Sequence, residues 1–210
     1  MRSFSVVSSE VLLKAQAECL LTPVGLLMSL DTVADAMNHP DVRPWFGHML
    51  QDELMPQMPP EGREEAVIQA CRYLSFKPAS MRLADLVDGM VGSWSLHILP
   101  LLNERTPRLV SAMAALIMLF TGIRREEEGY MLPQESMRGQ LLCRDETALR
   151  SFSRLSWDMP ADSLCYAVLS DAEIWGRDLR DMAFLPDMLT DSLTTIQLMG
   201  LRYALNGEEA

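Results

Sequence analysis

The stretch PRLVSAMAALIMLFTG, residues 107–122, decides the fold class of this chain. Nearly every position is apolar, Pro107 stands where the first turn of a helix tolerates a missing N–H, and Gly122 stands where helices commonly stop. A helix of about 14 residues rises about 21 Å, which is less than the roughly 30 Å of a bilayer's hydrocarbon core. We therefore predict a buried central helix and no membrane span.

Capping residues and prolines predict further helices on both sides of this segment. The first is expected to start at Ser8 or Ser9 and to stop near Leu21, because the residue before Pro23 avoids helical geometry. The other predicted helices follow Asp31, follow Asp41, and cover residues 61–76, 81–102, 145–157, 160–169, a short piece after Asp171, and 186–205. Ser80 is the expected cap of the helix over 81–102, and Asp145 that of the helix over 145–157.

No run in the chain shows the apolar–polar alternation of a strand, and the charged stretch over residues 123–140 is expected to be a loop. The fold class is therefore all-α, as one helical domain over residues 1–210 without an N-terminal dinucleotide-binding domain.

Composition excludes several classes of function. The net charge of −11 and the lack of a dense Lys/Arg patch argue against nucleic acid as a partner. The N-terminal residues have no apolar core of signal-peptide length, so we expect a cytoplasmic protein with no membrane partner. Cys19, Cys71, Cys143 and Cys165 form no Cys-x-x-Cys pair, which favours free buried thiols over a metal site.

The common catalytic signatures are absent as well. The sequence has no Gly-x-Gly-x-x-Gly, Walker loop, His-Glu-x-x-His or Gly-x-Ser-x-Gly. His39, His48 and His97 are separated from one another, so surface or hydrogen-bonded histidines are the simpler interpretation. Glu10, Lys14 and Glu18 repeat at spacing four, which is typical of an ion-paired helix face exposed to solvent.

Three segments in order, residues 20–42, 96–122 and 167–205, resemble the C-terminal helical domain of the polyol (long-chain mannitol) dehydrogenase family, and most of all its tagaturonate reductase (altronate oxidoreductase) branch. The most specific piece is Trp175-Gly176-x-Asp178-Leu179 followed by a helix that begins with a proline. The resemblance implies a mostly helical substrate domain, which in the family packs against a Rossmann domain that carries NAD. That Rossmann domain is not expected in this chain, which should bind no cofactor alone.

The resemblance also implies where catalytic residues would stand. The family pattern of Lys, Asn and His before the Pro-Val stretch falls on Glu10, Ala15 and Glu18, so no catalytic residue is expected here. A further family lysine falls near Ser93 or Ser95. Lys14, Ser93 and His97 remain candidates for a relic of the substrate pocket.

Two functions follow as hypotheses. The first is a non-catalytic relative of the substrate domain that serves as a binding or regulatory module. The second is the substrate part of a tagaturonate reductase that needs a separate Rossmann subunit. In the family one face of the helical domain is covered by its Rossmann neighbour, so a homodimer or a protein partner is expected on that face. An unrelated helical adaptor is disfavoured by the three ordered matches.

Overall fold

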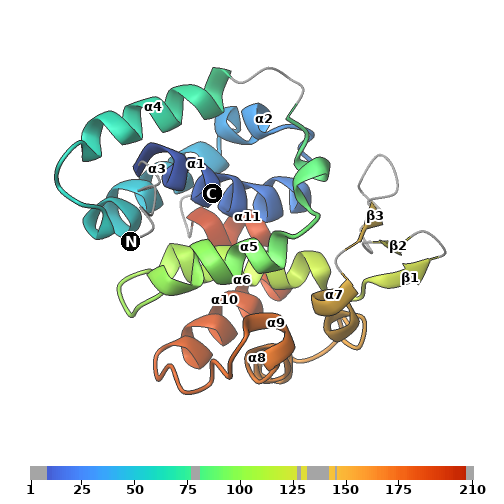
Figure 1. Cartoon of the computed structure of the whole chain (residues 1–210). Helices are drawn as coiled ribbons and strands as arrows, with labels where there is room; N and C mark the ends of the chain where they lie inside the picture. Colours follow the sequence, from blue (N-terminus) through green and yellow to red (C-terminus); the bar gives the residue numbers. More distant parts are fainter. Residues whose placement is uncertain (1–8, 77–80, 127–128, 132–141, 145, 207–210) are drawn as a thin grey trace, which may run out of the picture.

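Helices dominate the computed structural model, which describes residues 9–76, 81–126, 129–131, 142–144 and 146–206 (Figure 1). The central helix α6 (Pro107–Phe120) begins at the predicted proline, and its residues from Ala112 to Phe120 are fully buried. It packs against α1 (Ser9–Leu27) and against α10 (Leu185–Met199), which lie on opposite sides of it in Figure 1. The all-α prediction is confirmed, and α6 is the helix around which the others are arranged.

Before α6, the chain also forms α2 (Val33–Asn38), α3 (Val42–Met49), the π-helix η1 (Leu50–Leu54), the 3₁₀-helix η2 (Met55–Gln57) and α4 (Arg63–Phe76). After α6, it forms α7 (Glu146–Phe152), α8 (Ala161–Leu169), α9 (Ala172–Trp175) and α11 (Leu201–Asn206). Helix α11 contacts α3 as well as α6, so the end of the described chain returns to the earlier helices (Figure 1). The predicted last helix is divided into α10 and α11 at Gly200, whose φ is 86°.

Helix α1 does not stop before Pro23 as predicted but continues to Leu27. A proline inside a helix has no N–H to donate to the carbonyl four residues earlier, here that of Cys19. The indole Nε1 of Trp94 donates to this carbonyl at 2.9 Å and replaces the missing bond. A donor from a distant part of the chain therefore lets the helix pass through the proline.

The single helix predicted over residues 81–102 is wrong. The chain forms the 3₁₀-helix η3 (Leu83–Leu86), then α5 (Met90–His97), then the 3₁₀-helix η4 (Leu99–Leu101). Gly89 has a φ of 72°, a left-handed conformation that glycine adopts without a steric cost and that ends a regular helix. The predicted cap at Ser80 lies outside the described residues.

Part of the predicted loop over 123–140 forms a small sheet instead. Strands β1 (Arg124–Glu126) and β2 (Gly129–Met131) pair antiparallel, and β2 pairs antiparallel with β3 (Leu142–Cys143). Residues 127–128 and 132–141 lie outside the described part of the chain. Short strands at the surface pair through the backbone, so they do not need the apolar alternation by which strands are predicted.

Several predicted caps are shifted by the local hydrogen bonding. Thr32, not Asp31, caps α2, because it forms a capping box with Asp35. Asp41 precedes α3 but makes no capping hydrogen bond, and its carboxylate pairs with Arg202 Nε at 2.8 Å. Asp145 lies outside the described residues, and α7 ends at Phe152, before the predicted end at Trp157.

The four cysteines are free, and all but Cys71 are buried, as predicted from their spacing. Among the described helices, none combines the length and the apolar character that crossing a bilayer requires.

Candidate functional site

A cavity of about 200 Å³ opens where α1, η3 and α5 meet, and we call it the α1–α5 cavity. Four residues that the sequence analysis singled out lie around it, namely Ala15 and Glu18 of α1 and Ser93 and His97 of α5. The remaining lining residues are Cys19, Asp85, Leu86, Asp88 and Met90. Segments some 70 residues apart in sequence therefore share one site.

Close packing fixes the walls of the cavity. Gly25 lets η3 approach α1, because a Cβ at this position would lie 2.5 Å from Leu83 Cδ1. The side-chain amide of Gln16 donates to the carbonyl oxygen of His97 at 3.4 Å, and Trp94 bonds to the Cys19 carbonyl as described above. These contacts join α1 to η3 and α5, so the lining residues are held on a preformed frame.

The lining is acidic. Glu18, Asp85 and Asp88 contribute three carboxylates, and no lysine or arginine is among the described residues that line the cavity. One oxygen of Asp88, Oδ1, accepts a hydrogen bond from the backbone N–H of Arg144 at 2.7 Å, which orients that carboxylate. The described lining of the α1–α5 cavity therefore contains three carboxylates, one of which is oriented by the backbone.

Cys19 is not poised as a nucleophile, although it lines the cavity. Burial, and to a smaller degree the charge of Glu18, raises the pKa of the Cys19 thiol to about 12. The thiolate is the reactive form of cysteine, so this residue packs as a small apolar group.

Lys14 and Glu10, which the sequence also singled out, do not line the α1–α5 cavity. Lys14 Nζ pairs with Glu10 Oε1 at 2.5 Å and lies 4.2 Å from the centre of the Tyr73 ring of α4. These contacts direct Lys14 away from Ala15 and Glu18 toward α4, and neither Lys14 nor Glu10 is among the lining residues. Ser95 also lies outside the lining, and its hydroxyl donates to the carbonyl of Ile174 at 3.3 Å.

Sequence reasoning missed Asp85 and Asp88. The predicted helix over 81–102 assigned both of them to one continuous helix, in which Gly89 and Gly92 either permit close helix contact or mark a weak point, and the structure breaks it at Gly89. The signal was present in the Asp-Gly pair at 88–89, a dipeptide typical of turns.

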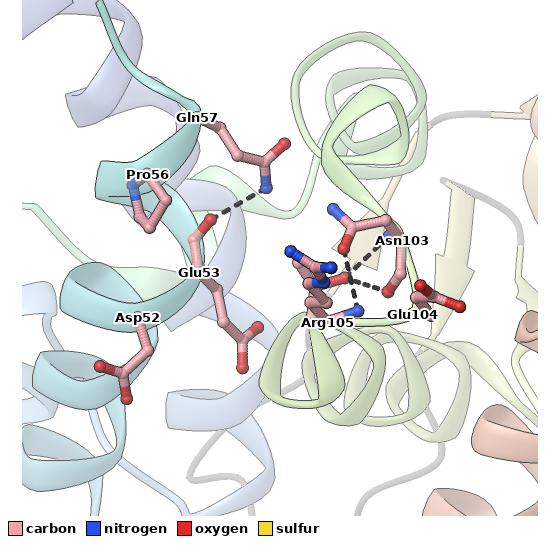
Figure 2. Close-up of a pocket in the computed structure, with 8 residues that line it drawn as sticks. Asp52, Glu53, Pro56, Gln57, Asn103, Glu104 and Arg105 are labelled. Carbon is pink, nitrogen blue, oxygen red and sulfur yellow. Dashed lines mark hydrogen bonds between the residues drawn. The ribbon is translucent and has the colours of Figure 1, made fainter. Parts of the chain in front are cut away.

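A second, larger cavity of about 370 Å³ lies beside the N-terminus of α6, and we call it the α6-end cavity. Figure 2 shows Asp52, Glu53, Pro56 and Gln57 on one wall and Asn103, Glu104 and Arg105 on the facing one. Most of its polar groups bond to the protein itself. The amide of Gln57 donates to the carbonyls of Glu53 and Leu101, and Asn103 exchanges hydrogen bonds with Thr106.

Glu53 has a structural role in this second cavity. Its buried carboxylate accepts the backbone N–H groups of Arg108 and Leu109, each at 2.9 Å, and so caps α6. Burial raises the pKa of Glu53, and the two N–H donors partly offset this effect. Because its donors and acceptors are largely committed, the α6-end cavity is the weaker candidate for a functional site.

The described residues contain no group of three or more His, Cys, Asp or Glu side chains placed to hold a metal ion. The described strands form one antiparallel sheet, whereas the pyrophosphate of NAD is held at a glycine-rich turn between a parallel strand and a helix.

Comparison with known proteins relates the chain to sugar-acid and polyol dehydrogenases. No family model matches it. It is 30% identical over 207 residues to altronate oxidoreductase of Cronobacter sakazakii and 25% identical over 192 residues to that of Bacillus subtilis. Each match covers 90% of this chain but only 40% and 38% of the respective enzyme, so the chain spans about two fifths of these relatives.

The fold has a solved counterpart. Mannitol 2-dehydrogenase of Pseudomonas fluorescens, in a ternary complex with NAD and D-mannitol, superposes with a TM-score of 0.72 at 15% identity. The match covers 96% of this chain and 41% of that enzyme. Sequence and fold together identify the chain as a homologue of part of the altronate oxidoreductases, consistent with the C-terminal helical domain of the polyol dehydrogenase family.

Proposed function

We propose that this chain is a non-catalytic relative of the substrate part of the altronate oxidoreductases and serves as a binding or regulatory module. One observation carries the proposal. The α1–α5 cavity contains Ala15 and Glu18, where the family resemblance implies an asparagine and a histidine.

The chemistry of alcohol oxidation explains why these residues matter. A base must accept the hydroxyl proton, and hydrogen-bond donors must stabilise the developing alkoxide or carbonyl oxygen. Ala15 has no polar side chain, and an ionised Glu18 would repel an alkoxide. Glu10, at the implied lysine position, is paired with Lys14, and Lys14 is directed toward α4 rather than into the cavity. The lysine, asparagine and histidine that the resemblance implies for the redox step are therefore absent from these three positions.

The first test is enzymatic. The purified chain is assayed for NAD-dependent oxidation of altronate, mannonate and mannitol, with the Cronobacter sakazakii altronate oxidoreductase as the positive control. We expect no turnover, and none from the triple variant Glu10→Lys/Ala15→Asn/Glu18→His, because hydride transfer also requires a bound dinucleotide. Micromolar binding of NADH in a calorimetric titration, or turnover by the unaltered chain, would overturn the proposal.

A second candidate function is the substrate part of a tagaturonate reductase completed by a separate Rossmann subunit. It is favoured by exposed apolar side chains near the cavity, where Val11 precedes Ala15 by one turn of α1 and Leu96 adjoins His97 on α5. Mass spectrometry of the natively purified protein identifies any companion that carries a dinucleotide-binding domain. NAD-dependent tagaturonate reduction by such a pair would support this candidate and exclude the first.

A further inference from the structure

We infer that the bond between Glu53 and the N-terminus of α6 is a proton-sensitive joint, which is closed at neutral pH and opens locally when Glu53 takes up a proton. Glu53 belongs to the π-helix η1, and α6 is the central helix of the fold. A change at this joint therefore alters how the earlier helices are attached to the middle of the molecule. The joint shares no described lining residue with the α1–α5 cavity and does not depend on what that cavity binds.

Both oxygens of the Glu53 carboxylate are used in the joint. Oε1 accepts the backbone N–H of Arg108 and Oε2 accepts that of Leu109, each at 2.9 Å. A carboxylic acid carries a hydrogen on one oxygen, and that hydrogen would face an N–H group that also has a hydrogen to donate. Protonation therefore weakens one of the two bonds, and it removes the negative charge that suits the dipole of α6.

The charges around Glu53 come from three segments. Asp52 is its neighbour on η1, and Arg108 Nη1 lies 3.3 Å from Asp52 Oδ2 and 3.6 Å from Glu53 Oε1. Glu104 and Arg105, in the segment before α6, line the facing wall of the α6-end cavity (Figure 2). One guanidinium is thus shared between two carboxylates, so it compensates the buried charge of Glu53 only in part.

Burial brings the proton uptake of Glu53 closer to neutral pH. The side chain is 1% exposed, and an ionised carboxylate away from water is costly unless its surroundings compensate the charge fully. This burial raises the pKa of Glu53, whereas the N–H groups of Arg108 and Leu109 and the charge of Arg108 lower it to a smaller extent. Glu53 therefore takes up its proton at a higher pH than an exposed glutamate does.

The surroundings of the joint keep the change local. Gln57 Nε2 donates to the carbonyl oxygens of Glu53 and Leu101, and these bonds involve no titrating group. They hold η1 and η2 in place while the first turn of α6 is released. The α6-end cavity, of about 370 Å³, lies directly beside Glu53 and gives water access to the opened joint.

Nuclear magnetic resonance of the isotope-labelled full chain follows the joint directly. We expect the Glu53 carboxyl carbon and the amides of Arg108 and Leu109 to titrate together, with a midpoint above that of the exposed Glu61. Hydrogen-exchange protection of the two amides, corrected for the intrinsic rate, should fall about two- to tenfold on protonation, the factor expected for one lost hydrogen bond. Amides that do not titrate, or a Glu53 midpoint at or below that of Glu61, would overturn the inference.

Two variants assign the titration to Glu53. Glu53→Gln keeps the shape of the side chain but takes up no proton, so the amides of Arg108 and Leu109 should become independent of pH. Asp52→Asn is the matched control, in which the titration should persist with a lower midpoint, because the charge of Asp52 raises the pKa of Glu53. Titration of both amides that persists in Glu53→Gln would show that another group is responsible and would contradict the proposed joint.

Urea denaturation across pH gives the sign of the linkage. Because the pKa of Glu53 is raised in the folded chain, its protonation stabilises the fold below the pKa of the unfolded chain, and this contribution is lost as the pH rises through the folded pKa. The stability of the unaltered chain relative to Glu53→Gln should therefore decrease between about pH 4 and about pH 8. An increase over the same range would overturn the inference, since it would mean that the folded state favours the ionised carboxylate.

Discussion

Pro23, Cys19 and Trp94 illustrate how single residues shape the site. Pro23 removes one backbone donor from the buried helix α1, and the indole of Trp94 supplies another to the same carbonyl of Cys19. A buried carbonyl without a partner is unfavourable, so the bond both continues α1 and attaches α5 to it. Because Ser93 and His97 belong to α5, this bond also positions two walls of the α1–α5 cavity.

We therefore predict that Trp94→Phe lowers the free energy of unfolding by about 1–3 kcal/mol, because the Cys19 carbonyl loses its donor. The measurement is urea denaturation. In a Pro23→Ala background the helix regains its own N–H at position 23, and the same substitution should cost less. Equal costs in the two backgrounds would show that the loss comes from packing of the larger ring and not from the hydrogen bond.

The N-terminus of α6 is the element in which a buried charge replaces a conventional cap. Thr106 precedes the helix, but its hydroxyl bonds to Asn103 and makes no capping hydrogen bond to α6. The carboxylate of Glu53, which belongs to the π-helix η1, bonds instead to the backbone N–H groups of Arg108 and Leu109. Negative charge at this end also suits the dipole of α6. The central helix is thus joined to a segment more than 50 residues earlier.

Glu53→Ala should destabilise the fold by about 1–3 kcal/mol, since two buried N–H groups lose their acceptor. Glu53→Gln should cost less, because its one amide oxygen can keep one of the two bonds. The control is Asp52→Asn, which removes a solvent-exposed partner of Arg108 and should cost less than about 1 kcal/mol. Thermal and urea unfolding rank the three variants by their loss of stability. If Glu53→Ala costs no more than Asp52→Asn, Glu53 is not the cap of α6.

At the scale of the whole molecule, apolar side chains remain exposed on α1 and α5, the two helices that contribute to the α1–α5 cavity. Val11 is 54% exposed, Leu12 40% and Leu96 69%. Exposed apolar groups that form a contiguous patch are typical of surfaces that contact another protein. This face is our proposed site of association, by a second copy of the chain or by a protein partner.

The corresponding prediction concerns oligomeric state. Light scattering after size-exclusion chromatography should give the mass of a dimer for the purified chain, and Val11→Glu/Leu96→Glu should shift it toward the monomer because charges in an apolar contact are unfavourable. Leu198→Glu, at an 80% exposed position on α10, is the control and should leave the mass unchanged. A monomer that also fails to bind a hydrophobic dye would remove the support for association through this face.

The sequence by itself determined the central helix, the all-α class, the free cysteines and the relation to polyol dehydrogenases. These features are local or compositional, since an apolar run flanked by Pro107 and Gly122 has few alternatives to a buried helix. It also singled out Ala15, Glu18, Ser93 and His97, which the fold brings to one cavity.

Tertiary structure decided what depends on partners far away in the chain. The local sequence predicts that α1 ends before Pro23, but the indole N–H of Trp94, 71 residues later, allows the helix to continue. Local rules also join residues 81–102 into one helix, whereas packing of Leu83 on Gly25 and the turn at Gly89 divide the segment and bring Asp85 and Asp88 to the cavity. The acidic character of the site depends on that arrangement, because no pattern within a single segment specifies which carboxylates the folded chain will place side by side.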